Sequence, residues 1–129
     1  MTEVDRINDL THRIIGAAMD VHRALGPGLL ESAYAACLAF ELVDRGLEVE
    51  RERPLPVIYR SVTLDCAYRI DLLVNREIIV ELKSVDKVVA IHKAQLRSYL
   101  KLANVKVGLL MNFNVEVLRD GITRVVNGL

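Results

Sequence analysis

Apolar side chains recur at three- and four-residue steps in three stretches of the chain, which is the spacing of one face of an α-helix. The first stretch, residues 7–25, ends at Gly26-Pro27-Gly28, because glycine accepts a left-handed cap and proline cannot continue a helix. The second is expected from about Leu29 to Arg45, with Gly46 as its cap. The third covers residues 90–103. Its apolar face is predicted to hold His92, Leu96, Tyr99 and Ala103, with Gln95 at the margin.

The segments between the second and third helices are rich in β-branched residues and predict strands. Residues 48–60 are expected to form an edge or bulged strand, because Pro54 and Pro56 cannot donate a backbone hydrogen bond. Residues 62–74 and 77–85 are predicted as the second and third strands.

Two further strand regions follow the third helix. Residues 105–112 are a short apolar run of the kind found in buried parallel strands. Residues 117–125 are predicted to form a terminal hairpin around an Asp120-Gly121 turn. The complete order is α-α-β-β-β-α-β-β, and a chain of 129 residues without repeats or linkers predicts one α/β domain over residues 1–129.

The second and third strands predict a hairpin whose register brings charged residues together. If the even-numbered apolar residues of both strands face one core, the numbers of directly paired residues must have an even sum. A sum of 152 pairs Leu73 with Ile79 and sets Asp71 opposite Glu81. A two-residue loop would separate the carboxylates, so we expect a three- or five-residue loop or a bulge. Lys83 then shares a face with Glu81. The even-numbered set is Ile70, Leu72, Val74, Ile78, Val80 and Leu82.

Composition narrows the class of protein. A hydrophobic content of 52% supports a packed core, whereas the lack of Trp argues against extensive stacking of bases on aromatic side chains. No apolar run is long enough to span a membrane and the first residues are acidic, so we expect a cytoplasmic protein without membrane association. Cys37 and Cys66 lack the spacing of a zinc site or disulfide framework and are predicted to be buried small hydrophobes.

The net charge of zero argues against non-specific binding of polyanions, but the charge is unevenly distributed. Residues 1–50 carry nine acidic and four basic side chains. Residues 51–129 carry thirteen basic and eight acidic side chains, so this part has a net charge of +5.

The charged patch on the hairpin has two interpretations. Two carboxylates and a nearby ammonium suit a hard divalent cation such as Mg²⁺, with the ammonium stabilising a phosphate or helping to activate water. The same residues also fit a solvated or salt-bridged sheet face, because an Asp followed ten residues later by Glu-x-Lys is a common pattern. Spacing alone leaves both open.

A resemblance to a known family favours the first interpretation. Asp71, the run Glu81-Leu82-Lys83 and Gln95 on the following helix resemble the pattern of the PD-(D/E)XK nuclease superfamily. More narrowly, Gly28-Leu29-Leu30-Glu31-Ser32-Ala33-Tyr34 is similar to the signature of the GxxExxY family within it. The flanking segments Val21–Gly28, Gln95–Leu100 and Gly108–Phe113 extend the resemblance over nearly the whole chain. It implies a restriction-endonuclease-like core, with a mixed β-sheet flanked by helices.

The resemblance also implies roles for particular residues. Asp71 and Glu81 would bind Mg²⁺, for which Mn²⁺ can substitute, with the main-chain carbonyl of Leu82 as a third ligand. Glu31 would add a ligand directly or through water. Lys83 would position or activate the attacking water, and Gln95 would orient water or contact nucleic acid. Ile70 departs from the pattern, since a proline often precedes the aspartate, but that proline is a loose feature.

Several charged and aromatic residues also fit a purely structural role. An acid such as Glu31 is favoured in the first turn of any helix by the exposed N–H groups. Tyr34 and Tyr99 are expected to be core aromatics whose hydroxyls find partners. A basic stripe at four-residue steps is equally consistent with a solvated helix face and with a nucleic-acid-binding track. It consists of Lys93, Arg97 and Lys101.

Three functions are therefore considered. The first is a Mg²⁺-dependent nuclease that hydrolyses phosphodiesters, with DNA the favoured substrate. The second is a binding or assembly module with this fold and little catalysis by itself, which would contact partners through the acidic N-terminal helices. The third is a hydrolase of small phosphorylated molecules, which uses the same metal chemistry. A domain of this size would also need a homodimer or larger assembly to surround a duplex.

Overall fold

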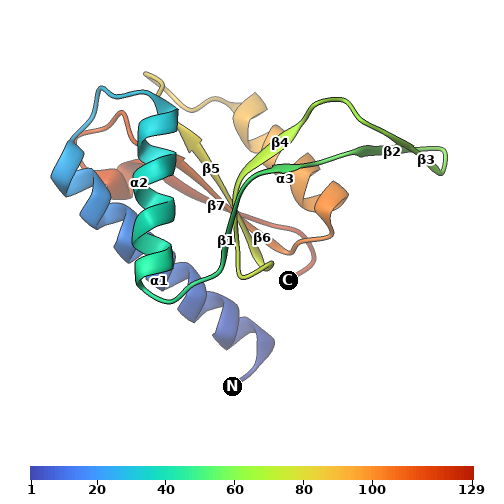
Figure 1. The fold of residues 1–129 in the computed structure, drawn as a ribbon, viewed down its shortest axis with the longest axis horizontal. Helices are drawn as coiled ribbons and strands as arrows, with labels where there is room; N and C mark the ends of the chain where they lie inside the picture. The colour runs from blue at the N-terminus through green and yellow to red at the C-terminus, as the bar shows by residue number, and fades with distance from the viewer.

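A five-stranded mixed sheet forms the centre of the computed structural model, which describes residues 1–129 (Figure 1). The strand order is β1-β4-β5-β6-β7, and only β5 and β6 are parallel neighbours. The predicted edge position of the first strand and the parallel pairing of the 105–112 run are confirmed, but the single strand predicted over residues 48–60 is wrong, because it ends at Pro54 and a separate short strand follows. The strands are β1 (Val49–Pro54), β4 (Arg69–Val74), β5 (Ile78–Lys83), β6 (Val107–Asn112) and β7 (Ile122–Val126).

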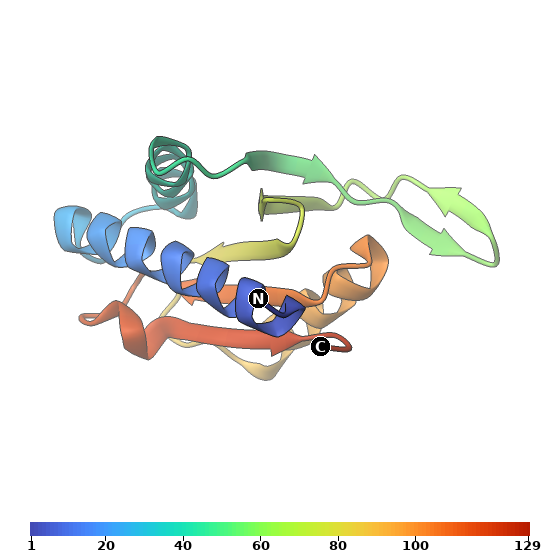
Figure 2. The ribbon, with the colours of Figure 1, turned by 90° about the horizontal axis from the view of Figure 1, so that it is seen from below.

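Helices cover both faces of this sheet. Helices α1 (Glu3–Leu25) and α2 (Glu31–Asp44) pack on one face in a cluster of 21 buried residues, and α3 (Ala90–Ala103) packs on the other in a cluster of ten. Figure 2 shows α1 running alongside the sheet. Helix α1 begins four residues before the predicted start, because Thr2 and Asp5 form a reciprocal capping box. The α/β fold class predicted for the chain is confirmed.

The predicted apolar face of α3 is partly correct. Leu96 and Tyr99 are buried as expected, but His92 and Ala103 are only half-buried, while Leu100 is fully buried. His92 instead accepts a hydrogen bond from the Val89 backbone N–H through Nδ1, at 3.1 Å. The buried face is therefore rotated from the predicted one toward Leu100.

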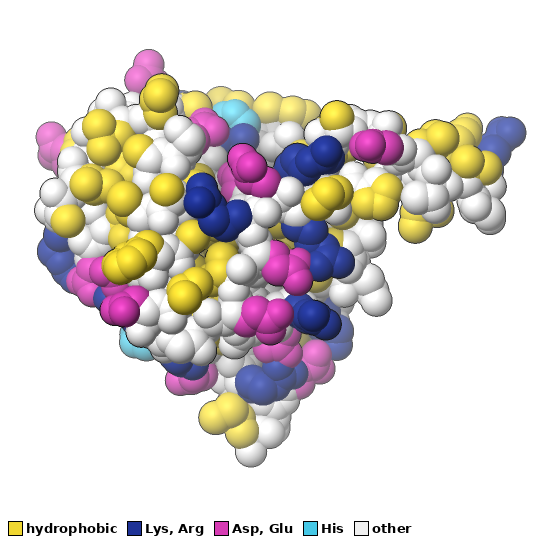
Figure 3. Space-filling model, viewed as in Figure 1, with side chains coloured by type: hydrophobic (Ala, Val, Ile, Leu, Met, Phe, Trp, Pro, Cys, Tyr) yellow, Lys and Arg dark blue, Asp and Glu magenta, His cyan; other side chains and the backbone are white.

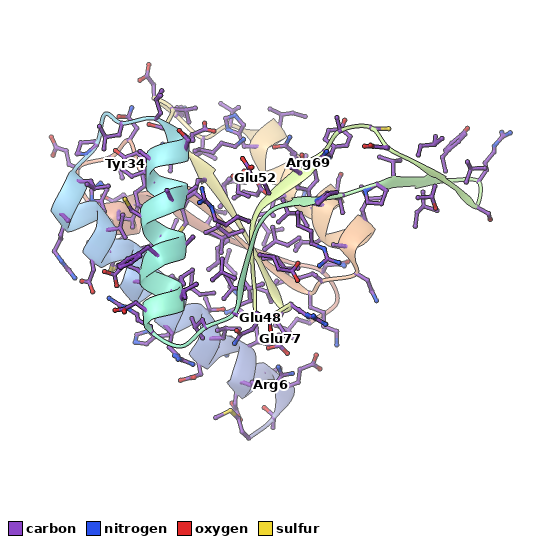
Figure 4. The ribbon with its side chains drawn as sticks, viewed as in Figure 1. Arg6, Tyr34, Glu48, Glu52, Arg69 and Glu77 are labelled. Carbon is purple, nitrogen blue, oxygen red and sulfur yellow. The ribbon has the colours of Figure 1, made fainter.

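The hairpin of β4 and β5 has the predicted register. Leu73 pairs with Ile79 and Val74 with Ile78, which leaves a loop of three residues, 75–77. Asn75 and Arg76 have positive φ angles of 50° and 58°, as a tight turn of this kind requires. The turn is also fixed from outside, because Glu77 forms an ion pair with Arg6 of α1 (Figure 4).

One expectation about this hairpin is wrong. Five of the six even-numbered apolar residues lie in the larger core cluster, but Ile70 packs in the cluster under α3. The alternation breaks between Ile70 and Leu72, opposite Glu52 of β1, whose φ is +50°. A residue in the left-handed region cannot continue a regular strand, so the side chains before and after it point to different faces.

The predicted single strand over residues 62–74 is also wrong. It divides into β3 (Val62–Leu64) and β4, and β3 pairs with β2 (Val57–Tyr59) to form a separate two-stranded hairpin. The division follows from an Asx turn, in which Asp65 Oδ1 accepts a hydrogen bond from the Ala67 N–H at 2.9 Å, and Ala67 has a φ of +62°. Figures 1 and 2 show that this arm projects away from the rest of the molecule.

The predicted terminal hairpin does not form. Residues Leu118–Gly121 are a short 3-10 helix, η1, and β7 pairs with β6 instead. Gly121 lies against the strand: a Cβ atom there would stand 2.2 Å from the backbone oxygen of Asn112. Joining a large sheet satisfies more backbone groups than an isolated two-stranded ribbon would.

Both cysteines are exposed, which contradicts their predicted burial. Cys37 lies on the outward face of α2, and Cys66 lies in the break between β3 and β4. None of the helices is both long enough and apolar enough to cross a lipid bilayer.

Candidate active site

The carboxylates of Asp71 and Glu81 meet where β4 and β5 separate. Glu81 Oε1 accepts a hydrogen bond from the Asp71 backbone N–H at 3.2 Å. Asp71 Oδ2 accepts one from the Leu82 backbone N–H at 2.9 Å. Each carboxylate is thus fixed by the other strand, and the convergence predicted from the register is present.

Glu81 is held in a setting that disfavours its negative charge. It is only 5% exposed, and its burial, with the nearby Asp71 carboxylate as the second cause, raises the pKa of Glu81 to about 9. Lys83 lowers this pKa by a smaller amount. At neutral pH Glu81 therefore keeps its proton in the metal-free protein, and a cation placed beside it would favour the charged form.

Lys83 is the last residue of β5 and is half-buried. Its carbonyl accepts a hydrogen bond from Phe113 at 2.9 Å. The chain beyond it is anchored by Asn112, a buried side chain that both donates to and accepts from the backbone of Val85, at 2.9 and 3.1 Å. The end of β5 is therefore fixed on its β6 side.

Glu31 approaches the same end of the sheet from the first turn of α2. Its Oε1 accepts from the Ser84 N–H at 3.4 Å, and Ser84 Oγ donates to the carbonyl of Leu29 at 2.6 Å. The two contacts tie the beginning of α2 to the residue that follows Lys83. Glu31 therefore lies beside the site, as predicted.

Tyr34 explains the spacing of the Gly28, Glu31 and Tyr34 signature. Its hydroxyl donates to the Gly26 carbonyl at 2.6 Å and accepts from the Leu29 N–H at 3.1 Å, while its ring stacks on Phe113. Gly28 has a φ of +100°, which favours glycine. The tyrosine thus holds the loop whose path determines where Glu31 points, and its expected place as a hydrogen-bonded core aromatic is confirmed (Figure 4).

A pocket of about 210 Å³ opens beside Asp71, between α2 and β1. Although acidic side chains gather there, no group of three His, Cys, Asp or Glu side chains is arranged to hold a metal ion. Asp71 and Glu81 are thus a pair of carboxylates and not part of a larger metal-ligating cluster. The pocket is lined by Glu31, Ser32, Ala35, Arg51, Glu52 and Asp71.

Gln95 and Tyr99 lie near the carboxylates from the α3 side. Gln95 Nε2 donates to the Tyr99 hydroxyl at 3.3 Å, and Tyr68 packs edge-on against the Tyr99 ring. Burial, followed by the charges of Glu81, Tyr68 and Asp71, raises the pKa of Tyr99. Gln95 thus reaches the site through Tyr99, whose hydroxyl finds a partner as expected.

The basic stripe of α3 lies entirely on the solvent side of that helix. Lys93, Arg97 and Lys101 are all exposed, and none forms an ion pair. Their charges are therefore free to interact with a ligand.

Three residues near the site were missed in the sequence. Asn112 could have been found from the sequence, because it is a polar side chain at the end of an apolar strand. Such a strand is expected to be buried, and a buried polar side chain needs hydrogen-bond partners. Arg51 and Glu52 carried none, since their approach to Asp71 depends on the pairing of β1 with β4.

Comparison with known proteins agrees with this arrangement. A family model described as the PD-(D/E)XK nuclease superfamily matches residues 8–125, which include every residue of the site. No curated protein matches the chain, and neither does any solved structure.

Proposed function

Because the chain belongs to the PD-(D/E)XK nuclease superfamily, we propose that it is a divalent-metal-dependent nuclease that hydrolyses phosphodiester bonds, with DNA as the favoured substrate. Within the superfamily we place it in the GxxExxY family, on the basis of Gly28, Glu31 and Tyr34. The observation that carries the proposal is the convergence of Asp71 and Glu81 at the fork between two strands.

The donor set fits a hard cation. Two carboxylates converge in a buried place where the second negative charge is disfavoured, so a divalent ion would restore the balance. We propose Asp71, Glu81 and the Leu82 carbonyl as direct ligands of Mg²⁺, with Mn²⁺ able to substitute. Glu31 acts through water, since it does not join a three-carboxylate cluster. When bound, the ion supplies an activated water and offsets charge on the phosphate.

The remaining residues act on the substrate and the water. Lys83, whose ammonium follows Glu81 by two residues, positions the water and stabilises charge that develops on the phosphate. Gln95 orients water together with the Tyr99 hydroxyl that it contacts. Lys93, Arg97 and Lys101 bind the backbone of the nucleic acid on the α3 side.

This function is tested by metal binding and cleavage measured on the same samples. We expect calorimetry to detect Mg²⁺ or Mn²⁺ binding by the wild type and not by Asp71→Ala. Plasmid nicking should fall by about 100-fold or more in both Asp71→Ala and Lys83→Ala, the usual scale for loss of an electrostatic catalytic group. Asp9→Ala is the matched control, because Asp9 is an exposed acid of α1 without an ion pair. Cleavage that survives both site substitutions contradicts the proposal.

An exposed apolar face supports a second role, in assembly. Phe40 is 71% exposed and Val43 is 58% exposed on α2, and Phe40 and Cys37 border a groove of about 350 Å³ against α1. Figure 3 shows hydrophobic side chains gathered over this side of the molecule. Asp20 and Glu41 line the groove and form ion pairs with Arg23 and Arg45, so both signs of charge lie at its edge. A face that carries both signs complements a rotated copy of itself, so we propose a second copy of this chain as its partner.

A further inference from the structure

Arg51 is the one basic side chain among the six residues that line the pocket beside Asp71. It lies on β1, directly across from Leu72, so it stands next to the position of Asp71 in the neighbouring strand. The other charged residues of the pocket are the carboxylates of Glu31, Glu52 and Asp71.

Arg51 is also unpaired. It forms no ion pair and no hydrogen bond, although three carboxylates line the same pocket, and its side chain is exposed. Arg53, two residues along the same strand, is instead paired with Glu50. A guanidinium without a protein partner keeps all of its donors free for a ligand.

The break in β1 sends these two arginines to opposite faces of the sheet. Glu52, the residue between them in the chain, has a φ of +50°; Figure 4 labels its position on β1. As a result Arg51 lines the pocket with Asp71 and Glu31, whereas Arg53 lines a different pocket, with Ile70 and Leu73. The irregular backbone at Glu52 is therefore what brings Arg51 to the site.

We propose that Arg51 binds a phosphate of the nucleic-acid backbone adjacent to the scissile one. This inference rests on the proposed nuclease function and adds to it a path for the substrate, along the cleft between β1 and α2. Without Arg51, the three carboxylates of the pocket would repel a phosphodiester. A planar guanidinium accepts two phosphate oxygens at once, so Arg51 both attracts the backbone and fixes its register against Asp71.

The path differs from the one that the α3 stripe provides. Helix α3 and its basic residues lie on the opposite face of the sheet from α2. A strand contacted by both would pass over the end of the sheet, where β4 and β5 separate and the carboxylates lie. Arg51 and the stripe would then hold the backbone on either side of the cleavage position.

The test measures DNA binding as a function of salt, on the Lys83→Ala background so that the DNA stays intact. The probe is a fluorescein-labelled DNA duplex in Mg²⁺. Addition of Arg51→Ala is expected to weaken binding by about tenfold and to reduce the slope of log affinity against log salt by about 0.9, the value for one phosphate contact. Arg51→Lys should keep most of the slope and lose part of the affinity, because lysine cannot bind two oxygens at once.

Arg53→Ala is the matched control, since it removes the same charge from the same strand on the other face. It should change the DNA affinity by less than about twofold. The slope of log affinity against log salt should change by less than about 0.2. In the catalytically intact protein, Arg51→Ala should raise KM more than it lowers kcat.

The outcomes separate the two proposals. Binding with an unchanged salt slope in Arg51→Ala, or an equal effect of Arg53→Ala, overturns the role of Arg51 and leaves the nuclease function standing. Failure of the Lys83→Ala protein to bind DNA at all overturns the nuclease function on DNA, and the role of Arg51 with it.

Discussion

At the scale of single residues, Glu81 couples the stability of the metal-free protein to pH. Its pKa is about 9 in the folded protein and near 4.5 in the unfolded chain. Between those values the folded protein binds a proton that the unfolded chain has released, so the contribution of Glu81 to stability is fully present below about pH 4.5 and is lost as the pH rises toward 9. A group that resists ionisation in this way opposes folding at neutral pH unless a cation compensates it.

We therefore expect Glu81→Gln to stabilise the protein in EDTA. Glutamine keeps an oxygen for the Asp71 N–H and carries no charge, so the variant should exceed the wild type by roughly 1–3 kcal/mol at pH 8, the usual cost of an uncompensated buried group. Near pH 4.5 the wild type and Glu81→Gln should have nearly equal free energies of unfolding. Thermal unfolding across this pH range measures the difference.

Addition of metal tests the same effect by compensating the charge of Glu81 instead of removing it. Millimolar Mg²⁺ at pH 8 should raise the unfolding temperature of the wild type and leave that of Glu81→Gln nearly unchanged, because a ligand that binds only the folded state stabilises it. A wild type whose stability rises between pH 5 and 9 without metal would contradict this account of Glu81.

The residue scale also shows what the sequence could reveal. Side chains alternate in a regular strand, so the parity of residue numbers was enough to predict that Asp71 faces Glu81. The same rule misplaced Ile70 and gave no hint of Arg51, because alternation fails opposite Glu52. A glutamate with a left-handed backbone conformation is unusual, and nothing in its sequence neighbourhood announces it.

At the scale of elements, the connection between α1 and α2 determines where Glu31 lies. Tyr34→Phe removes the hydroxyl that binds Gly26 and Leu29 and keeps the ring that stacks on Phe113. We expect a loss of about 1–2 kcal/mol in unfolding free energy and faster amide exchange at Leu29. Cleavage should fall further than stability explains, since Glu31 loses its orientation.

Tyr59→Phe is the control for this substitution. Tyr59 lies on the projecting arm, is 59% exposed and makes no hydrogen bond through its hydroxyl, so its variant should match the wild type in both stability and cleavage. Equal behaviour of the two variants would show that the Tyr34 hydroxyl does not hold the loop.

The elements that sequence predicted well have local causes. Turn length and apolar patterning determined the hairpin of β4 and β5, and period and composition located α3 within its observed bounds. The predicted terminal hairpin failed because distant segments compete for the same strand, whereas the predicted 62–74 strand divides at the local Asx turn of Asp65. The Asp120-Gly121 pair is a good hairpin turn, yet β6 offers β7 a better edge than residues 117–119 do.

At the scale of the whole molecule, periodicity cannot tell which apolar surface stays exposed. Helix α2 is apolar on nearly every side, so its pattern predicted burial for Cys37, although the structure covers only the side that holds Tyr34, Leu38 and Leu42. The outer side has no partner within the chain. The buried core of a protein and the centre of an interface have similar amino-acid compositions, so the sequence alone does not distinguish them.

That outer side leads to a prediction about the assembly. If two copies meet through α2, Phe40→Glu should convert the dimer into a monomer, because each interface would then contain two buried, facing carboxylates. Ile91→Glu is the matched control: Ile91 is 69% exposed, close to the 71% of Phe40, but it lies on α3. Sedimentation equilibrium at roughly 10–100 μM, the range that a modest interface requires, should show a dimer for the wild type and for Ile91→Glu and a monomer for Phe40→Glu.

Equal thermal stability of the two variants at low concentration would exclude unfolding as the cause. A wild type that stays monomeric throughout this range, while it cleaves DNA, would show that one copy is sufficient and that α2 serves a different partner.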